Sequence, residues 1–149
     1  MRSVRTAKSG QVVVEMLLTL PVFLTIVFSI MEIGYVSFQV IVLNHATYEV
    51  ARIGGMTTPF SSGQPQVNGG YLNDIMTRIL KNASVDCEAL PTIEDPQAGQ
   101  QNYDLRCEST EQVKLIFPIS SIILADHWGS GERTLHAVVR MPIEQPLKR

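Results

Sequence analysis

Charged side chains are scarce in this sequence. Asp, Glu, Lys and Arg make up 17% of its 149 residues, whereas about 25% is typical of soluble globular domains. The low charge, together with 45% hydrophobic residues, excludes a disordered polar tail. Acidic residues outnumber basic ones by 14 to 12, and Arg2, Arg5 and Lys8 lie within the first ten positions. A basic stub on an otherwise acidic chain does not predict a nucleic-acid partner, and we expect none.

Sequence motifs of catalysis are also missing. The histidines His45, His127 and His136 lack the spacing of metal ligands such as H-E-x-x-H, and there is no Walker A loop or dinucleotide fingerprint. Asp126, His127 and Ser130 are hydrolase residue types, but no G-x-S-x-G elbow accompanies them, and adjacent side chains on one loop rarely form a triad. We therefore expect a protein that is not an enzyme and has no metal, cofactor or small-molecule substrate.

What the sequence does contain is a long apolar run near its N-terminus. Residues 16–43 include one charged side chain, Glu32, and would measure about 42 Å as a helix. A bilayer core of about 30 Å needs about 20 residues, so the run is long enough to span a membrane. It exceeds the apolar region of a cleaved signal peptide, and residues 44–47 match a small-x-small cleavage site poorly. The basic residues before the run predict a cytoplasmic N-terminus and a C-terminal part in the periplasm or outside the cell.

A single long helix is predicted over residues 11–54. Its interior contains Pro21 and Gly34 but no turn cluster, and Gly54-Gly55 is typical of a helix C-terminus. Pro21 removes one backbone hydrogen bond and should bend the helix near its start. Residues 1–10 form a basic leader to this helix, and residues 55–70, which are rich in Gly and Pro, are expected to be a linker.

Residues 71–149 are expected to form a small exported domain, so that the fold class is α+β. Apolar residues at helical spacing predict a short amphipathic helix over residues 71–81. Alternating apolar and polar residues predict an antiparallel sheet of about four strands, covered by this helix and by the end of the long helix. The strands are expected at residues 84–90, 102–108, 112–117 and 134–141, with loops at 91–101 and 125–132.

The two cysteines, Cys87 and Cys107, both fall in predicted strands of the exported part. A zinc site normally has four ligands in close pairs, and the chain has no such pair. We favour a single disulfide formed in an oxidising compartment, with two separate buried thiols as the alternative. A bridge closing about 20 residues would contribute about 3 kcal/mol in the chain-entropy model.

The junction between the basic leader and the apolar run reads SGQVVVE, with Gly10 followed at the fifth position by Glu15. This arrangement resembles the processing site of type IV pilin-like proteins, which a membrane-embedded prepilin peptidase cuts after the glycine. Here the cut would fall between Gly10 and Gln11. A carboxylate in hydrocarbon costs about 2.5–3.5 kcal/mol and usually has a partner. The resemblance implies that the α-amino group of an adjacent subunit pairs with Glu15; the alternative is an ordinary anchor in which Glu15 marks the interfacial end.

Further residues narrow this resemblance. Pro21 follows Glu15 by six positions, Ile33-Gly34 lies within the run, and Ala46 and Ala51-Arg52 lie at its exit. Over residues 10–53 the chain resembles TadE-like minor pseudopilins of tight adherence (Tad) pilus systems, and over residues 112–141 it resembles them more loosely. The resemblance implies a non-enzymatic inner-membrane subunit that helps to initiate or complete an adherence pilus. Its implied partners are the membrane, a prepilin peptidase, other minor pseudopilins and the major pilin.

Two residues and two other functions stay open at this point. Glu32 either pairs with a basic group of a neighbouring subunit or lies near the outer membrane interface. Trp128 is expected to anchor its loop to the core or to a partner. One other function is an uncleaved single-pass anchor whose exported domain binds a ligand or an envelope protein, and another is an anchored hydrolase. Cleavage after Gly10 would distinguish the pilin-like function from the uncleaved anchor and from the anchored hydrolase.

Overall fold

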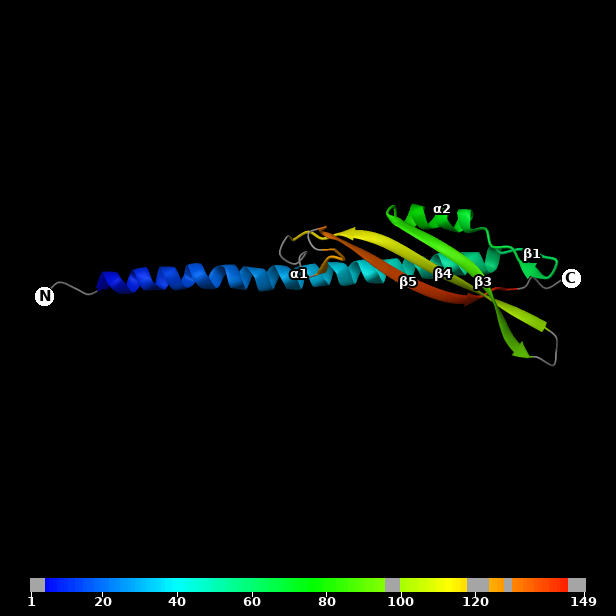
Figure 1. Cartoon of the computed structure of the whole chain (residues 1–149), viewed down its shortest axis with the longest axis horizontal. Helices are drawn as coiled ribbons and strands as arrows, with labels where there is room; N and C mark the ends of the chain where they lie inside the picture. The colour runs from blue at the N-terminus through cyan, green and yellow to red at the C-terminus, as the bar shows by residue number, and fades with distance from the viewer. Residues whose placement is uncertain (1–4, 96–99, 118–123, 128–129, 145–149) are drawn as a thin grey trace. The chain divides into compact units, whose positions relative to one another are not determined.

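The structure is a computed structural model that describes residues 5–95, 100–117, 124–127 and 130–144 (Figure 1). Two helices, α1 (Arg5–Thr57) and α2 (Gly69–Ile79), accompany a small hairpin and a three-stranded antiparallel sheet. The α+β prediction of a long apolar helix, a short helix and an antiparallel sheet is confirmed. The strands are β1 (Phe60–Ser61), β2 (Gln64–Pro65), β3 (Ala83–Asp95), β4 (Gln100–Lys114) and β5 (Glu132–Pro142).

The chain divides into two compact units, each built from segments far apart in the sequence. The first unit combines Met1–Val36 with Lys114–Glu132, and the second combines Ser37–Val113 with Arg133–Arg149. The first unit therefore holds the apolar start of α1, whereas the second holds the end of α1 and most of the sheet.

Helix α1 ends three residues later than the sequence predicts. It continues through Gly54 and Gly55 to Thr57, so the predicted end at this glycine pair is wrong. A Cβ atom on Gly54 would lie 2.5 Å from Leu105 Cδ2 and 3.1 Å from Leu72 Cδ1. Gly54 therefore does not end the helix. Because it has no side chain, it lets α1 approach β4 and α2 closely. At its other end α1 begins at Arg5, inside the predicted leader.

The sheet has the strand order β3-β4-β5, three strands where the sequence predicts about four. The separate strands predicted at residues 102–108 and 112–117 are wrong, because β4 continues through Ser109 and Glu111 to Lys114. These two polar side chains point to the buried face of the sheet, where apolar residues are expected. Their polarity breaks the apolar alternation in the sequence without breaking the strand.

β3 is also longer than predicted. It pairs with β4 in antiparallel register from Ala83↔Glu111 to Thr92↔Asn102 and reaches Asp95, so the loop predicted at residues 91–101 is too long. Pro91 lies within the strand, opposite Tyr103. A proline is tolerated there because β3 is at the edge of the sheet and the missing N–H breaks no ladder between two strands.

The core of the second unit lies between α1 and the inner face of the sheet. From the helix come Leu43, Ala46, Val50 and Ala51, all buried. α2 packs beside β3, and its Asn73 side chain accepts a hydrogen bond of 3.0 Å from the Val85 backbone N–H. The buried apolar residues of α2 and the strands are Leu72, Met76, Ala83, Val85, Cys87, Leu105, Cys107, Val113, Leu135 and Ala137.

The segment predicted as a linker contains a small hairpin. β1 and β2 pair antiparallel across Ser62 and Gly63, which both have positive φ angles, 54° and 82°. Two such residues form the tight turn that matches the twist of a hairpin. Phe60 packs edge-on against Tyr103 of β4, with ring centroids 6.1 Å apart, so the hairpin is attached to the sheet. Asn68 then caps α2 by accepting a hydrogen bond from the Tyr71 N–H, 3.1 Å away.

Candidate functional site

The apolar start of α1 is the largest candidate site. Within α1, Gly10–Thr57 is long and apolar enough to cross a membrane and fits a single-pass anchor. From Gly10 to Leu24 every side chain is exposed, and most are large and apolar. Exposed apolar surface of this extent has to be covered by lipid or by other helices. Residues in this part of α1 therefore face an environment that lies outside the described chain.

Gly10 and Gln11, the predicted processing site, lie within the helical backbone of α1. Both residues are exposed, and a Cβ atom on Gly10 would meet nothing within 4 Å. Packing within the described chain thus does not require a glycine at this position. Cleavage after Gly10 stays a prediction.

Glu15 and Pro21 lie on the same exposed stretch of α1. The Thr19 hydroxyl donates to the Glu15 main-chain carbonyl (2.7 Å), while no side-chain partner of the Glu15 carboxylate is found among the described residues. The Thr25 hydroxyl similarly donates to the Pro21 carbonyl, 2.8 Å away. The predicted bend at Pro21 and the predicted pairing of Glu15 with a neighbouring subunit both stay predictions.

Glu32 has a different environment from Glu15. Its side chain is 0% exposed, and its two carboxylate oxygens accept hydrogen bonds of 2.9 Å from the backbone N–H groups of Ile116 and Phe117. One turn earlier, the Phe28 ring stacks on the Phe117 ring, with centroids 4.9 Å apart and an interplanar angle of 13°. We call these contacts the Glu32 clasp. The clasp satisfies the carboxylate from within the chain, and contact of Glu32 with a neighbouring subunit stays a prediction.

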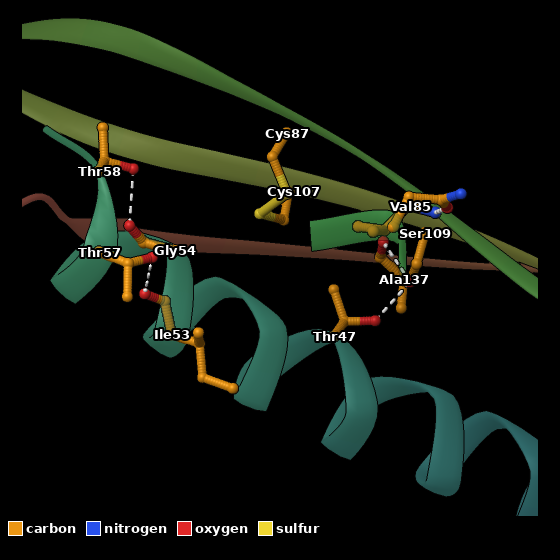
Figure 2. Close-up of a disulfide and its surroundings, with 11 residues drawn as sticks. Thr47, Ile53, Gly54, Thr57, Thr58, Val85, Cys87, Cys107, Ser109 and Ala137 are labelled. Atoms are coloured by element: carbon orange, nitrogen blue, oxygen red, sulfur yellow. Dashed lines mark hydrogen bonds between the residues drawn. A yellow bond between two sulfur atoms is a disulfide. The ribbon is translucent and has the colours of Figure 1, made fainter. Parts of the chain in front are cut away.

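The predicted disulfide between Cys87 and Cys107 is confirmed (Figure 2). The two residues are direct partners in the β3–β4 register, their Cα atoms are 4.1 Å apart, and the described chain has no free cysteine. Both side chains are buried on the sheet face that packs on α1. The bridge therefore joins two neighbouring strands at the core of the second unit.

A pair of buried hydroxyls links α1 to the sheet near this bridge. Thr47 of α1 and Ser109 of β4 are both 0% exposed and are joined by a short hydrogen bond (Figure 2). Because each hydroxyl has one proton, both are satisfied when Thr47 donates to the Leu43 carbonyl (2.7 Å) and Ser109 donates to Thr47. The Ala137 carbonyl of β5 lies 3.4 Å from the Ser109 oxygen. This pair fixes the position of α1 against β4.

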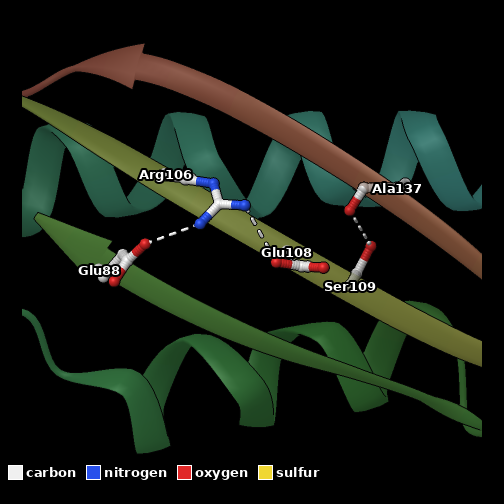
Figure 3. A network of polar contacts seen from close by, with 5 residues as sticks. All are labelled: Glu88, Arg106, Glu108, Ser109 and Ala137. Carbon is white, nitrogen blue, oxygen red and sulfur yellow. Dashed lines mark hydrogen bonds and ion pairs between the residues drawn. The ribbon is translucent and has the colours of Figure 1, made fainter. Parts of the chain in front are cut away.

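The outer face of the sheet has a polar cluster instead (Figure 3). The Arg106 guanidinium donates to Glu88 on β3 (2.9 Å) and to Glu108 on β4 (3.3 Å). All three side chains are substantially exposed, and exposed ion pairs contribute about 0–1 kcal/mol each. Together with Asp86 and His136 they line a groove of about 640 Å³. The cluster stabilises the strand pair only modestly.

Of the residues with hydrolase types, Ser130 contacts the backbone of His127. The Ser130 hydroxyl donates to the main-chain carbonyl of His127 (3.0 Å), so it engages the backbone of that residue and not its ring. Groups of three or more His, Cys, Asp or Glu residues that could hold a metal are absent among the described residues. Trp128, the predicted anchor of this loop, lies outside the described residues.

Sequence reasoning missed Phe117, Thr47, Ser109 and Glu111. Phe117 is predicted to end a strand, but its N–H donates to Glu32 and its ring stacks on the Phe28 ring. One signal was available for the other three: hydroxyl and carboxyl side chains stand at positions where the helical and strand patterns place the core. Such residues need buried partners, and the sequence does not say which.

A known protein family matches part of the chain. Residues 10–52 match the family model described as TadE-like protein. No match was found among the curated proteins or among the solved structures. The matched segment begins at the predicted processing glycine and covers the exposed apolar part of α1, the Glu32 clasp residue and Thr47. Over residues 10–52 the chain is therefore similar to TadE-like proteins, which confirms the resemblance expected for this part of its sequence.

Proposed function

We propose that this protein is a minor pseudopilin subunit that helps to assemble or initiate a Tad-type adherence pilus. It is a non-enzymatic protein of the inner membrane, with a cytoplasmic N-terminus and a C-terminal domain in the periplasm or outside the cell. A prepilin peptidase removes its first ten residues by cutting after Gly10. Its partners are other minor pseudopilins and the major pilin.

The observation that carries the proposal is the TadE-like match together with the apolar surface that α1 leaves uncovered. This surface is not confined to the start of the helix. In the second unit, Phe38, Ile41 and Tyr48 are 61%, 57% and 47% exposed. With His45 they follow the alternating three- and four-residue spacing of one helix face, which is typical of a helix that packs against another helix.

Glu15 supplies the specificity of this packing in the proposed assembly. Its carboxylate stands in an apolar, exposed part of α1, where a charge needs a partner. After cleavage, the α-amino group of Gln11 in a neighbouring subunit provides the opposite charge. The pairing aligns two helices along their axes, because any other offset leaves one charge unpaired.

A second candidate function is an uncleaved anchor whose exported domain binds a ligand or an envelope protein. The groove of about 640 Å³ on the outer face of the sheet favours it, because Arg106 and the neighbouring carboxylates offer both signs of charge. The Arg106 guanidinium is already paired with Glu88 and Glu108, however, so a ligand would have to compete with these ion pairs. We therefore rank this function second.

The mature N-terminus tests the proposal. The protein is purified from membranes of its own host, where the cognate peptidase is present, and its intact mass is measured. A chain that begins at Gln11 supports the pseudopilin function. A chain that begins at Met1 contradicts it and favours the uncleaved anchor.

A further inference from the structure

The apolar part of α1 is too long for one bilayer, so its position in the membrane has to be determined by something else. Residues 16–43 would measure about 42 Å as a helix, against a hydrocarbon core of about 30 Å. Hydropathy alone does not say which part of this length lies in lipid. The contacts of the first unit do, because they differ along the helix.

Side-chain exposure divides this part of α1 at about Thr25. Up to Leu24 every described side chain is exposed around the whole helix. From Thr25 onward one face is covered: Thr25 and Ser29 are partly buried, and Glu32, on the same face, is completely buried. The covering segment at Glu32 is the chain that follows β4, residues 115–117.

The covering segment cannot lie in hydrocarbon. Its backbone is neither helix nor strand. Its N–H groups donate to Glu32 and to the Gly131 carbonyl, but its carbonyl groups lack the regular hydrogen-bond ladder that a lipid-exposed backbone needs within a bilayer core. The residue before it, Lys114, has an exposed side chain that carries a charge. Because Glu32 is hydrogen-bonded to this segment, the Glu32 level of α1 must also lie outside the hydrocarbon.

Counting back from this limit gives a span of the right length. Residues 11–28 of α1 are 18 residues, or about 27 Å, close to the thickness of a bilayer core. The upper end of the span then lies at Phe28, whose ring stacks on Phe117. Ile116 is 60% exposed and the neighbouring Lys114 is also exposed, so the segment presents one apolar and one cationic side chain, and both kinds of side chain are tolerated at the interface between hydrocarbon and headgroups.

We infer that residues 114–117 form a lipid-contact segment that rests in the headgroup layer of the bilayer, and that the Glu32 clasp thereby fixes the end of the α1 span at Phe28. The inference rests on the membrane insertion in the proposed function. It adds a second membrane contact, made by a segment more than 80 residues further along the chain. It also assigns Glu32 a role that is distinct from that of Glu15.

Depth-dependent fluorescence quenching tests the inference. The full-length protein is reconstituted in vesicles of phosphatidylethanolamine and phosphatidylglycerol, and an environment-sensitive fluorophore is attached to Ile116→Cys. Val22→Cys provides a probe within the span, and Tyr48→Cys provides an exposed probe in the second unit. The native cysteines do not react, because they are bonded to each other. Lipids that carry a spin label on the headgroup or deep in the acyl chain are the quenchers.

We expect the probe at Ile116 to be quenched most by the headgroup label, the probe at Val22 most by the deep label, and the probe at Tyr48 by neither. If no lipid label quenches the probe at Ile116, the inference is wrong. This holds even when the probe is also protected from a water-soluble quencher such as iodide, because a neighbouring protein then covers it in place of lipid. Quenching at Val22 in that case would leave membrane insertion, and hence the proposed function, intact. Loss of quenching at both positions would contradict insertion itself.

A clasp variant tests whether Glu32 holds the segment in place. Glu32→Gln keeps the shape of the side chain but replaces one charge-assisted acceptor with an amide donor, so one of the two backbone N–H groups loses its partner. We expect a loss of headgroup quenching at Ile116 with unchanged deep quenching at Val22. Glu49→Gln, on the exposed surface of α1, is the matched control. Equal quenching at Ile116 in wild type and Glu32→Gln would overturn the role of the clasp.

Discussion

The Glu111 carboxylate lies on the inner face of β4, the face that also carries Cys107 and Ser109. It is 8% exposed, and its Oε2 atom has no hydrogen-bond partner among the described residues. Burial favours the neutral form of a carboxyl group, so desolvation raises the pKa of Glu111 above its ordinary value of 4.5. This residue opposes folding at neutral pH, because the charged form has to be buried or a proton has to be bound.

Glu111 predicts a specific pH dependence of stability. Its pKa is higher in the folded than in the unfolded chain, so its contribution to the free energy of unfolding is complete below pH 4.5 and is lost as the pH rises through the folded pKa. Glu111→Gln cannot ionise and should escape this loss. In urea titrations of the detergent-solubilised protein, the stability of Glu111→Gln relative to wild type should therefore increase from acidic to neutral pH. Glu108→Gln, on the outer face, is the control; a difference that does not change with pH would contradict the prediction.

Glu15 predicts a separation of membrane insertion from assembly. Replacing Glu15 with Val removes a costly charge from an apolar stretch, so insertion should be unchanged or improved. Assembly should fail, because removing one member of a buried ion pair typically costs about 3–5 kcal/mol. Glu15→Gln should be intermediate, since it keeps a hydrogen-bond acceptor without the charge.

Co-purification with partner pilins at matched membrane levels measures this effect. Glu49→Val is the control on α1, because Glu49 is exposed and pairs with Arg52 of its own helix. If Glu15→Val assembles as well as wild type, the pairing between subunits is wrong.

Among the elements, α1 offers two glycines with opposite surroundings. A Cβ atom at Gly54 would lie 2.5 Å from Leu105 Cδ2, in a core position that is completely buried, whereas one at Gly34 would meet nothing within 4 Å. Alanine is the better helix former at both positions. At Gly54 the cost of overpacking therefore opposes the gain in helix propensity, whereas at Gly34 there is no such cost.

Gly54→Ala should destabilise the protein, whereas Gly34→Ala should not. Overpacking a core typically costs about 1–3 kcal/mol, which exceeds the roughly 0.5–1 kcal/mol that alanine gains over glycine within a helix. Unfolding free energies from urea titration of both variants check this. A Gly54→Ala variant as stable as Gly34→Ala would show that Leu105 and Leu72 can move aside at little cost.

The cross-strand disulfide predicts a redox-dependent stability. Replacing both Cys87 and Cys107 with Ala should lower the free energy of unfolding by about 3 kcal/mol, as expected for a closed loop of about 20 residues. Wild type treated with a reductant should lose a similar amount, and the double variant should not respond to the reductant. Equal stability of oxidised and reduced wild type would contradict this.

Which elements the sequence could predict depends on how local their causes are. α1 follows from an apolar run without turn signals, and α2 follows from helical spacing, because both depend on neighbours a few positions away. The continuity of β4 depends on Ser109, whose partner Thr47 lies 62 positions earlier. The position of Glu32 depends on N–H groups 84 and 85 positions later. A polar residue in an apolar pattern indicates that a buried partner exists, but only the fold shows which residue that partner is.

For the whole molecule, the proposed cleavage changes the N-terminus without changing the described packing. Gly10→Val should leave the fold unaffected, because a side chain at this position meets nothing within 4 Å. It should block cleavage, since a branched side chain crowds the cleft of the peptidase. Mass spectrometry of the membrane protein should then find the uncut chain, with Arg2, Arg5 and Lys8 retained. Gly34→Val, in the same helix, is the control and should be cut normally; efficient cleavage of Gly10→Val would contradict the prediction.

The Glu32 clasp also sets an order of events during synthesis. Ribosomes add roughly 5–20 residues per second, so the residues that hold Glu32 leave the ribosome about 4–17 s after Glu32 itself. During this interval the N–H groups that bond to Glu32 do not yet exist, so the carboxylate needs another partner, which water supplies only outside the hydrocarbon. A nascent chain that inserts up to Phe28 and pauses there keeps Glu32 hydrated until residues 116 and 117 arrive. Residues 116 and 117, which are made late, thus fix the membrane position of a helix that was made first.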